Sequence, residues 1–401
     1  MLQIVAGLAL LVVVALAGYR RTFTRLPVGA RLLFLTGTEY IFVGYALGEN
    51  MIGLLDEPTI RSLTPLFSLG LGLIGLMLGL PLEVPLLRRF PASWFRMTVT
   101  QAVVTMVVVF GPAYIFLRAV SGVEGPELLL ASLVLATTAA CTAQSALAIL
   151  SRELSLGATR TMQVLRYVSS LDGAVAVSVF GLAICLLHHA PLIGPGTLVT
   201  LQWFVLSVGI GVATGFLLHL LTRIRCREEE LLLFVIGMVL FASGLALYLK
   251  LSPLFVNLVM GVVAANQPGP KTRILNLLAR LEKPFYVVFL VLAGAIWQMD
   301  TAWALPLAAL YFALRLAGKV GGGALAVSIS GERPRPPRLL GLGLVSQGGV
   351  VIAMAMSYYQ VSSFPLAEVV VTAVLLGVIF SELFGPALAR LLLRNGPGGA
   401  S

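Results

Sequence analysis

Apolar residues gather in long runs along the chain, and short polar stretches separate one run from the next. A helix needs about 20 apolar residues to cross a hydrocarbon core of about 30 Å, and most runs approach that length. The pattern predicts thirteen membrane-spanning helices, at residues 2–18, 31–48, 62–80, 97–118, 128–151, 162–187, 196–221, 230–248, 251–267, 284–300, 303–330, 338–358 and 366–390. We therefore expect an all-α polytopic membrane protein. A short amphipathic stretch, Ile274–Lys283, is expected to lie at the interface before the tenth span.

The composition excludes a soluble protein. Of the 401 residues, 59% are hydrophobic and only 11% are charged, whereas about 25% of a soluble domain is charged. Too few residues remain outside the apolar runs for a soluble regulatory domain, so we expect one transmembrane domain over residues 1–401. The net charge of +10 raises nucleic acid as a partner, but an excess of Lys and Arg also marks cytoplasmic loops. We therefore expect a lipid bilayer and no nucleic acid as the partner.

Basic residues fall in alternate loops, from Arg20, Arg21 and Arg25 near the start to Arg390 and Arg394 at the end, and the loops between them are poor in Lys and Arg. Because cytoplasmic loops carry the basic excess, this alternation predicts an external N-terminus and a cytoplasmic C-terminus in the plasma (inner) membrane. The first run lacks the basic segment that begins a signal peptide, so we expect it to be retained.

Asp172 is the acid that stands out at membrane depth, about ten residues into the span 162–187. An ionisable residue there is costly and is a functional candidate by default. Ser169 lies one turn earlier on nearly the same face. The alternative is that a basic partner neutralises Asp172 and thereby locks two helices together.

Two other spans carry weak helical sequence halfway along. The fifth reads Ala-Thr-Thr-Ala-Ala-Cys-Thr-Ala-Gln over residues 136–144, and the twelfth contains Ser346-Gln347-Gly348-Gly349. Local unwinding there would expose backbone carbonyls that must line a cavity, while close helix packing is the alternative. The two spans are seven apart, so they run in opposite directions. We therefore expect an inverted repeat with two broken helices that cross near the midplane.

Arg315 and Lys319 lie near mid-depth in the eleventh span and share a helix face because they are four residues apart. Such cations can offset carbonyls exposed at the end of a half-helix, while extension to the membrane surface is the alternative. We expect both to be structural, since a fixed cation beside an ion site repels a cationic substrate.

Several stretches, in order along the chain, are similar to signatures of one transporter superfamily. They are Gly79-Leu80 to Glu83 with Arg88-Arg89 ("GLE…LRR"), Leu251-Ser252-Pro253-Leu254 with Gly261 and Ala265-Asn266 ("LSP…GxxxAN"), Pro284-Phe285 with Phe289 and Gly294 ("PFF…F…G"), Leu314-Arg315 with Gly318-Lys319 ("RxxGK"), and Gly341-Leu342-Gly343-Leu344 with Gln347-Gly348-Gly349 ("LGLGLLPQGG"). On these motifs the chain, over about residues 31–390, resembles the monovalent cation:proton antiporters, which include sodium/proton exchangers and Kef-like potassium/proton antiporters.

Two functional motifs of that superfamily match only in part. Thr142-Ala143-Gln144 stands where exchangers have Thr-Asp-Pro, and Leu171 precedes Asp172 where they have Asn, Asp or Gln. Tyr167 takes the place of a glutamate found in many exchangers. Glu39, about eight residues into the second span, is a candidate to replace that acid as a partner of Arg315 or Lys319.

The resemblance implies a secondary antiporter whose core helices, about 97–187 and 303–390, move against a scaffold that also forms a homodimer. Asp172 is expected to bind either H⁺ or a monovalent cation, Na⁺ or K⁺, because a carboxylate is a hard oxygen ligand that can also take a proton. Further oxygens are expected from Thr142, Ser169, the carbonyls of Ala140 and Cys141, and the side chain of Gln144 or Gln347. We expect one-for-one exchange, no cofactor and no enzymatic activity.

Two other functions stay open on the sequence. One is a sodium-coupled symporter of organic anions on a related fold, which ion-dependent solute uptake without proton movement would reveal. The other is a membrane sensor that keeps the fold without exchanging ions, and its best support is the missing neighbour of Asp172. Cation-dependent pH change in liposomes separates the sensor from the antiporter.

Overall fold

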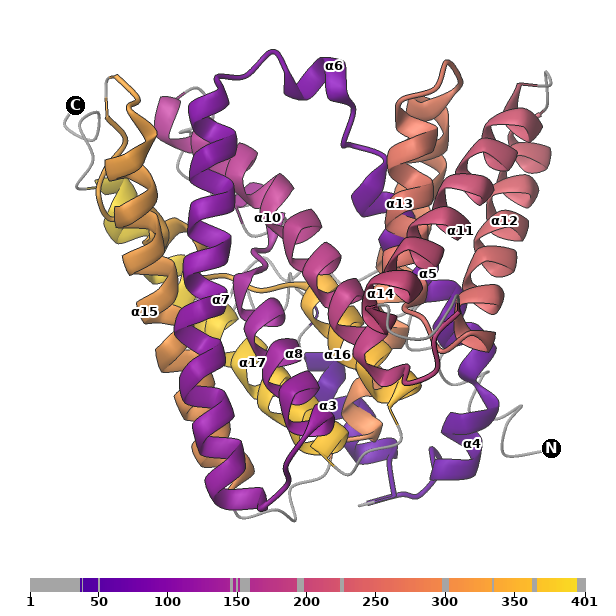
Figure 1. Ribbon diagram of the computed structural model, residues 1–401, viewed down its shortest axis with the longest axis horizontal. Coiled ribbons are helices and arrows are strands. Elements are labelled where there is room, and N and C mark those ends of the chain that lie inside the picture. Colours follow the sequence, from indigo (N-terminus) through magenta and orange to yellow (C-terminus); the bar gives the residue numbers. More distant parts are fainter. Residues whose placement is uncertain are drawn as a thin grey trace, which may run out of the picture.

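The computed structural model describes residues 37, 39–49, 51–144, 147–148, 151, 159–192, 198–223, 227–297, 303–333, 335–362 and 366–394, and most of them are helical (Figure 1). The helices are α3 (Glu39–Leu47), α4 (Glu57–Ser62), α5 (Thr64–Gly79), α6 (Val84–Leu87), α7 (Ala92–Ser121), α8 (Pro126–Ala140), α10 (Arg160–Ile184), η1 (Cys185–Leu187), α11 (Val199–Thr222), α12 (Glu228–Tyr248), α13 (Pro253–Ala265), α14 (Lys271–Ala295), α15 (Ala304–Ser330), η2 (Leu340–Leu344), α16 (Gly349–Val361) and α17 (Leu366–Arg394).

The predicted all-α membrane architecture is confirmed. In the part of the chain that the structure describes, six helices are long and apolar enough to cross a membrane, namely α7, α10 with η1, α11, α12, α15 and α17 up to Leu392. Shorter apolar helices lie in the remaining predicted spans from 31–48 onward, and the first predicted span, 2–18, lies outside the described residues. The amphipathic stretch Ile274–Lys283 is not separate from the tenth span, because α14 runs without interruption from Lys271 through Pro284 to Ala295.

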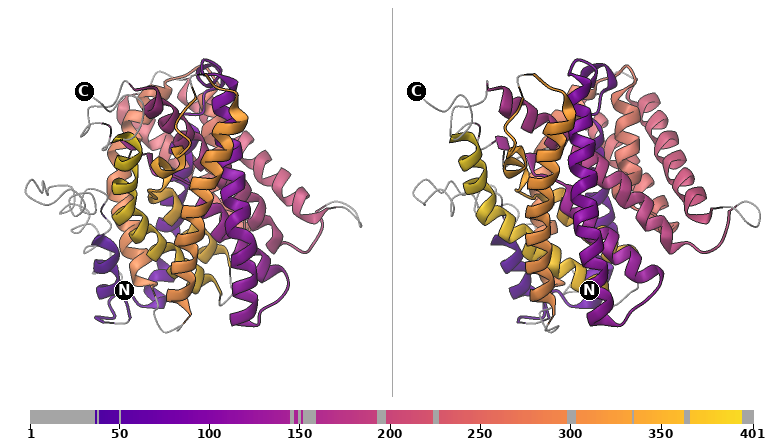
Figure 2. Two further views of the ribbon diagram at one scale, coloured as in Figure 1. Left: turned by 90° about the vertical axis from the view of Figure 1, so that its left-hand side faces the viewer. Right: turned by 60° about the vertical axis from the view of Figure 1, so that its left-hand side comes forward.

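The helices form two groups on either side of α10 (Figure 1). One group holds α7, α8, α15, α16 and α17, and Figure 2 shows α7 and α15 side by side along most of their length. The other group holds α5, α11, α12 and α13, with α3 and α14 packed against each other. Gly75 permits the close approach of α5 to α13, because a Cβ there would overlap the carbonyl of Leu254.

Two of the predicted spans in the first group, the fifth and the twelfth, are each interrupted by a non-helical segment, and the two segments lie against each other. The helix α8 ends at Ala140, Cys141 is extended, and residues 141–143 are not helical. In the second case η2 ends at Leu344 and α16 begins only at Gly349. The Ala143 N–H donates to the Ser346 carbonyl at 2.9 Å, so the two unwound segments touch. The predicted crossing of two broken helices is confirmed.

A buried carboxylate joins α7, α10 and the end of α15. Glu332 is 7% exposed and accepts hydrogen bonds from Ser93, from the indole of Trp94 at 3.2 Å and from Arg160. Burial by itself raises the pKa of Glu332, but these hydrogen bonds and the charge of Arg160 together hold it below its ordinary value of 4.5. Sequence reasoning missed this network, since Glu332 is far along the chain from Ser93 and from Arg160.

We expect Glu332→Gln to lower the free energy of unfolding by about 2 kcal/mol near neutral pH, because three hydrogen bonds to a charged acceptor are lost or weakened. A lowered folded-state pKa means that this stabilisation is complete above the ordinary value and disappears as the pH falls through the folded-state value. Thermal unfolding of the wild type and the variant should therefore differ at pH 7 and converge in acid. A constant difference across that range would contradict the assignment.

Candidate ion-binding site

Asp172 lies in the middle of α10 and is completely buried. The helix begins at Arg160, and the hydroxyl of the preceding residue, Thr159, accepts from the Met162 N–H as an N-cap. From that start Asp172 lies about 18 Å along the helix axis, at 1.5 Å per residue. A carboxylate this deep needs compensating partners, because burial of an unpaired charge is very costly.

The first partner of Asp172 is the unwound segment after α8. The Thr142 hydroxyl donates to Asp172 Oδ2 at 2.5 Å, and the Thr142 N–H approaches Oδ1 at 3.3 Å. A continuous helix would commit that N–H to a carbonyl four residues earlier. The break in α8 therefore frees the backbone donor that the carboxylate uses.

The second partner is Lys319 of α15, whose Nζ lies 3.1 Å from Asp172 Oδ2. Both side chains are completely buried. The same ammonium donates to the Ala140 carbonyl at 2.5 Å and to Thr142 Oγ1 at 2.9 Å. The sequence predicts a structural role for Lys319, and the structure places its ammonium directly against the carboxylate of Asp172, because α15 crosses the break in α8 closely enough for the lysine to reach it. The interpretation of Asp172 as half of an ion pair between two helices describes this geometry.

Three oxygens surround the Lys319 ammonium, and they come from Asp172, Thr142 and Ala140. A carboxylate, a hydroxyl and a carbonyl are the hard oxygen donors that bind alkali or alkaline-earth cations in proteins. All three residues are among the cation ligands predicted from the sequence. The ammonium therefore lies among three oxygens of the type that ligate such cations.

Arg315, one turn before Lys319 on α15, joins the end of α8 to the second unwound segment. Its Nη1 donates to the Ala139 carbonyl, and its Nη2 lies 2.9 Å from the Val345 carbonyl and 3.4 Å from those of Leu344 and Ser346. Ala139 and Ala140 form the end of α8, where the helix dipole leaves partial negative charge. The positive charge of Arg315 therefore compensates the carbonyls that the breaks leave without helical donors, as predicted. Because Arg315 is completely buried, its side chain does not extend to the membrane surface.

We expect Arg315→Lys to lower the free energy of unfolding by about 2 to 4 kcal/mol, because one ammonium cannot replace a planar fork that reaches two segments and buried carbonyls lose their donors. Thermal unfolding in detergent measures the effect. Arg118→Lys is the matched control, since Arg118 is exposed and pairs with Glu124 at 2.8 Å on the surface. Such a pair contributes at most about 1 kcal/mol, and equal effects of the two substitutions would contradict the bridging role.

Other predicted ligands lie near Asp172, but the hydrogen bonds that the structure describes for Asp172 do not include them. The Ser169 hydroxyl donates to the Arg166 carbonyl at 3.1 Å, and the Ser169 carbonyl accepts from Gln144 Nε2 at 3.4 Å. Cys141 is a free, buried cysteine in the break. Of the predicted ligands, Thr142 hydrogen-bonds to Asp172, and the Ala140 carbonyl accepts from the Lys319 ammonium.

Gln347 belongs to a separate polar cluster on the far side of the crossing. Its amide donates to the Tyr311 hydroxyl at 2.8 Å and to the Thr138 carbonyl at 3.2 Å, and it accepts from Ser381 at 3.1 Å. Gln347 thus fixes the second unwound segment and does not contact Asp172. Sequence reasoning missed Tyr311 and Ser381, although both are polar residues inside predicted spans.

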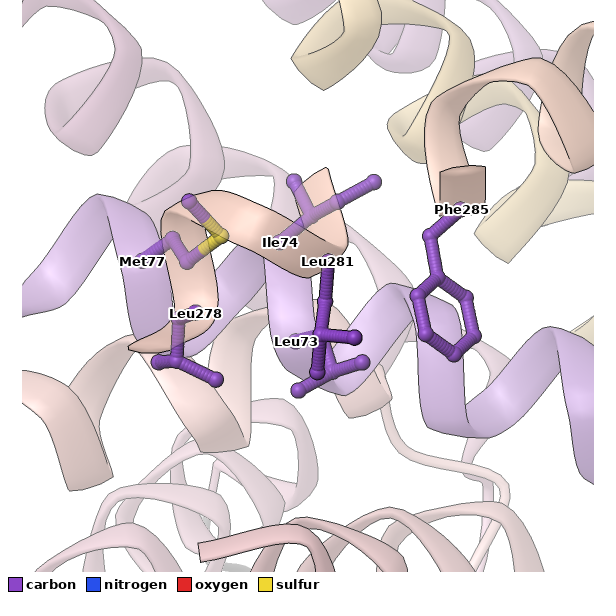
Figure 3. Close-up of a pocket in the computed structure, with 6 residues that line it drawn as sticks. All are labelled: Leu73, Ile74, Met77, Leu278, Leu281 and Phe285. Atoms are coloured by element: carbon purple, nitrogen blue, oxygen red, sulfur yellow. The ribbon is translucent and has the colours of Figure 1, made fainter. Parts of the chain in front are cut away.

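Glu39 does not supply the missing acid to this site. It lies on α3, which packs against α14, and the described hydrogen bonds of Arg315 and Lys319 go to α8, the two breaks and Asp172. A hollow of about 10 Å³ lies between α5 and α14. Figure 3 shows the side chains that line it, all apolar, which include Leu73 and Phe285. Such a dry, small space offers nothing to an ion.

Comparisons with known proteins agree with this picture. The family model described as sodium/hydrogen exchanger, transmembrane, matches residues 8–394. The fold is similar to the solved structure of the sodium proton antiporter MjNhaP1 from Methanocaldococcus jannaschii at pH 8, with a TM-score of 0.66 and 15% identity over 98% of this chain and 99% of that one. No curated protein matches the sequence. The superfamily to which the motifs pointed is confirmed, and the chain belongs to the sodium/hydrogen exchanger family, a family of cation:proton antiporters.

Proposed function

We propose that the protein exchanges Na⁺ or K⁺ for H⁺, and that the cation competes with the Lys319 ammonium for the oxygens of Asp172, Thr142 and Ala140. The observation that carries this proposal is the ammonium itself, which contacts all three oxygens at 2.5 to 3.1 Å. The family and the structural relative, titled a sodium proton antiporter, support cation:proton antiport as the reaction.

Charge makes the competition exclusive. Two unit charges about 4 Å apart repel each other by about 4 kcal/mol at an effective dielectric constant of about 20. A cation that enters among the three oxygens therefore drives Lys319 to release its proton or to withdraw. When it releases the proton, an Asp172 carboxylate with a cation replaces an Asp172 carboxylate with a lysine ammonium, and the net charge of the site is unchanged.

The arrangement of the helices in two groups supports a mechanism of alternating access. We propose that the group with the broken helices moves against the group with α5, α11, α12 and α13, so that Asp172 opens to one side of the membrane at a time. In this proposal the protein lies in the plasma membrane with a cytoplasmic C-terminus, and the second group also forms a homodimer. A crossing of short half-helices suits this movement, because the site moves with the crossing as a unit.

Proteoliposomes with a pH-sensitive dye test the reaction. We expect Na⁺ or K⁺, added outside liposomes that hold an acidic interior, to drive proton efflux, and a comparison of Na⁺, K⁺, Li⁺ and Rb⁺ gives the selectivity. Absence of a cation-dependent pH change from folded, correctly inserted protein would reject antiport and favour a membrane sensor.

We expect electroneutral, one-for-one exchange, because the two loaded forms of the site carry the same net charge and transfer of a neutral site avoids moving charge through the bilayer. Solid-supported membrane electrophysiology and the dye assay on the same proteoliposomes measure it. A robust dye signal without a transient current agrees with the prediction. A current that accompanies exchange, with a rate that depends on an imposed potential, would mean that Asp172 and Lys319 both carry protons.

A further inference from the structure

A cavity of about 400 Å³ lies between the two helix groups, beside the ion site and apart from it. We call it the lateral groove. Its walls are Phe95 of α7, Leu171, Val175 and Val179 of α10, and Val259 and Val262 of α13. Figure 1 shows α10 running diagonally between α7 and α13. Phe95 is 53% exposed, so the groove opens at the surface of the transmembrane helices.

The lining of the lateral groove does not suit an ion or a polar solute. The hydroxyl of Ser178, which also lines it, donates to the carbonyl of Ala174 within α10 at 2.8 Å. The other lining side chains are apolar, and an apolar cavity binds water poorly because water needs two or more polar partners. At this depth in a membrane, the chemistry that fills such a space is a hydrocarbon chain.

One end of the lateral groove lies beside the segment that joins Leu82 to Phe95. This segment carries Arg88 and Arg89, both exposed, and in the part of the chain that the structure describes neither forms an ion pair. Phe90 beside them is 40% exposed and Leu86 is 44% exposed. Apolar side chains next to arginines are typical of a segment at the level of the lipid headgroups.

The segment is anchored at both sides of the groove. On the side of α13, Asn266 donates to the Leu82 carbonyl at 3.0 Å and accepts from the Val84 N–H at 2.8 Å. On the other side, Phe90 stacks on Trp94 of α7 with ring centres 5.4 Å apart and contacts Tyr167 of α10 at 5.0 Å. The two arginines therefore have a defined place beside an open, apolar groove.

We propose that the lateral groove binds an acyl chain of an anionic phospholipid, whose phosphate is held by Arg88 and Arg89. A chain gains little from moving out of one apolar environment into another, so the selectivity comes from the headgroup. Two arginines near an anionic headgroup favour it over a zwitterionic one by about tenfold or more. Because its walls belong to both helix groups, the bound lipid slows their relative movement; this consequence rests on the proposed function, whereas the binding does not.

Fluorescence quenching by lipids brominated in the acyl chain tests the binding without any transport. The reporter is the tryptophan of Phe95→Trp. The variant is reconstituted in phosphatidylcholine with a low, fixed fraction of either brominated phosphatidylglycerol or brominated phosphatidylcholine. The fluorescence of the parent protein, which has four tryptophans, is subtracted. We expect several-fold stronger quenching by the anionic lipid. Val107→Trp, at a 66% exposed position of the same helix, should be quenched equally by both.

The arginines provide the decisive comparison. Arg88→Gln with Arg89→Gln should abolish the anionic preference at Phe95→Trp and leave Val107→Trp unchanged, and Val179→Trp serves as a second reporter if Phe95→Trp does not fold. Equal quenching by the two brominated lipids at the groove would overturn the proposal. Strong quenching by aqueous iodide there would also overturn it, since the groove would then be a water-filled passage. Neither result depends on whether the protein exchanges ions.

Discussion

Asp172→Asn should reduce cation-dependent proton exchange to the level of empty liposomes, a loss of at least about a hundredfold. The reason is that the amide keeps the shape of the side chain and can still accept from Thr142, but it has no charge with which to hold a cation or to balance Lys319. At the buried site, an uncharged ligand does not repay the desolvation of a cation. The dye assay in proteoliposomes measures the loss.

The control for Asp172→Asn is Asp56→Asn. Asp56 caps α4 by accepting from the Thr59 N–H at 3.0 Å, and Asn caps a helix about equally well, so exchange and folding should both be unchanged. Size-exclusion chromatography and thermal unfolding establish that Asp172→Asn is folded. Wild-type exchange by folded Asp172→Asn would reject this site altogether.

Lys319→Gln should lower the free energy of unfolding by about 3 to 5 kcal/mol in the absence of Na⁺ and K⁺, because Asp172 keeps its buried charge and loses the cation that compensates it. If the ammonium occupies the cation site, an added cation should restore what the substitution removes. The expected result is a rise in the unfolding temperature of Lys319→Gln with Na⁺ that is clearly larger than the rise in the wild type. In the wild type, Na⁺ must first displace the lysine.

Two further proteins complete the Lys319 test. The double variant Asp172→Asn/Lys319→Gln has neither charge, so it should be more stable than Lys319→Gln and should not respond to Na⁺. Lys271→Gln is the matched control, since Lys271 pairs with Glu83 at 2.7 Å where both side chains are about 30% exposed. Its effect should stay within about 1 kcal/mol. A Na⁺ response of Lys319→Gln no larger than that of the wild type would contradict the competition.

The Asp172 and Lys319 tests distinguish a purely structural ion pair between two helices from a transport site. If the ion pair is purely structural, the protein loses stability when either charge is removed, and its stability does not depend on Na⁺ or K⁺. A transport site in which the ammonium substitutes for the cation shows the same loss, but with a dependence on Na⁺ or K⁺ that disappears together with Asp172. Stability measured with and without the cation therefore tests the proposed chemistry before any flux is measured.

The sequence by itself determined the class of fold and the position of the buried carboxylate, Asp172. Hydropathy is a local property, and a bilayer demands long apolar helices, so the spans could be predicted one by one. The breaks at 141–143 and 345–348 could also be predicted, because small residues and paired glycines hold a helix weakly. Asp172 stood out because a charge at mid-depth is rare.

Only the tertiary structure decided what each polar side chain meets. Lys319 and Asp172 are 147 residues apart in the chain, and helical periodicity shows that Arg315 and Lys319 share a face without showing what that face contacts. The packing of α15 across the break in α8 directs Arg315 to carbonyls and Lys319 to the carboxylate. The tertiary structure also gives the side chains of Gln347 and Ser169 partners other than Asp172. It brings Glu332, just after the end of α15, against Arg160 of α10. Such contacts depend on how helices cross, and a sequence pattern with a period of one helical turn carries no information about the crossing.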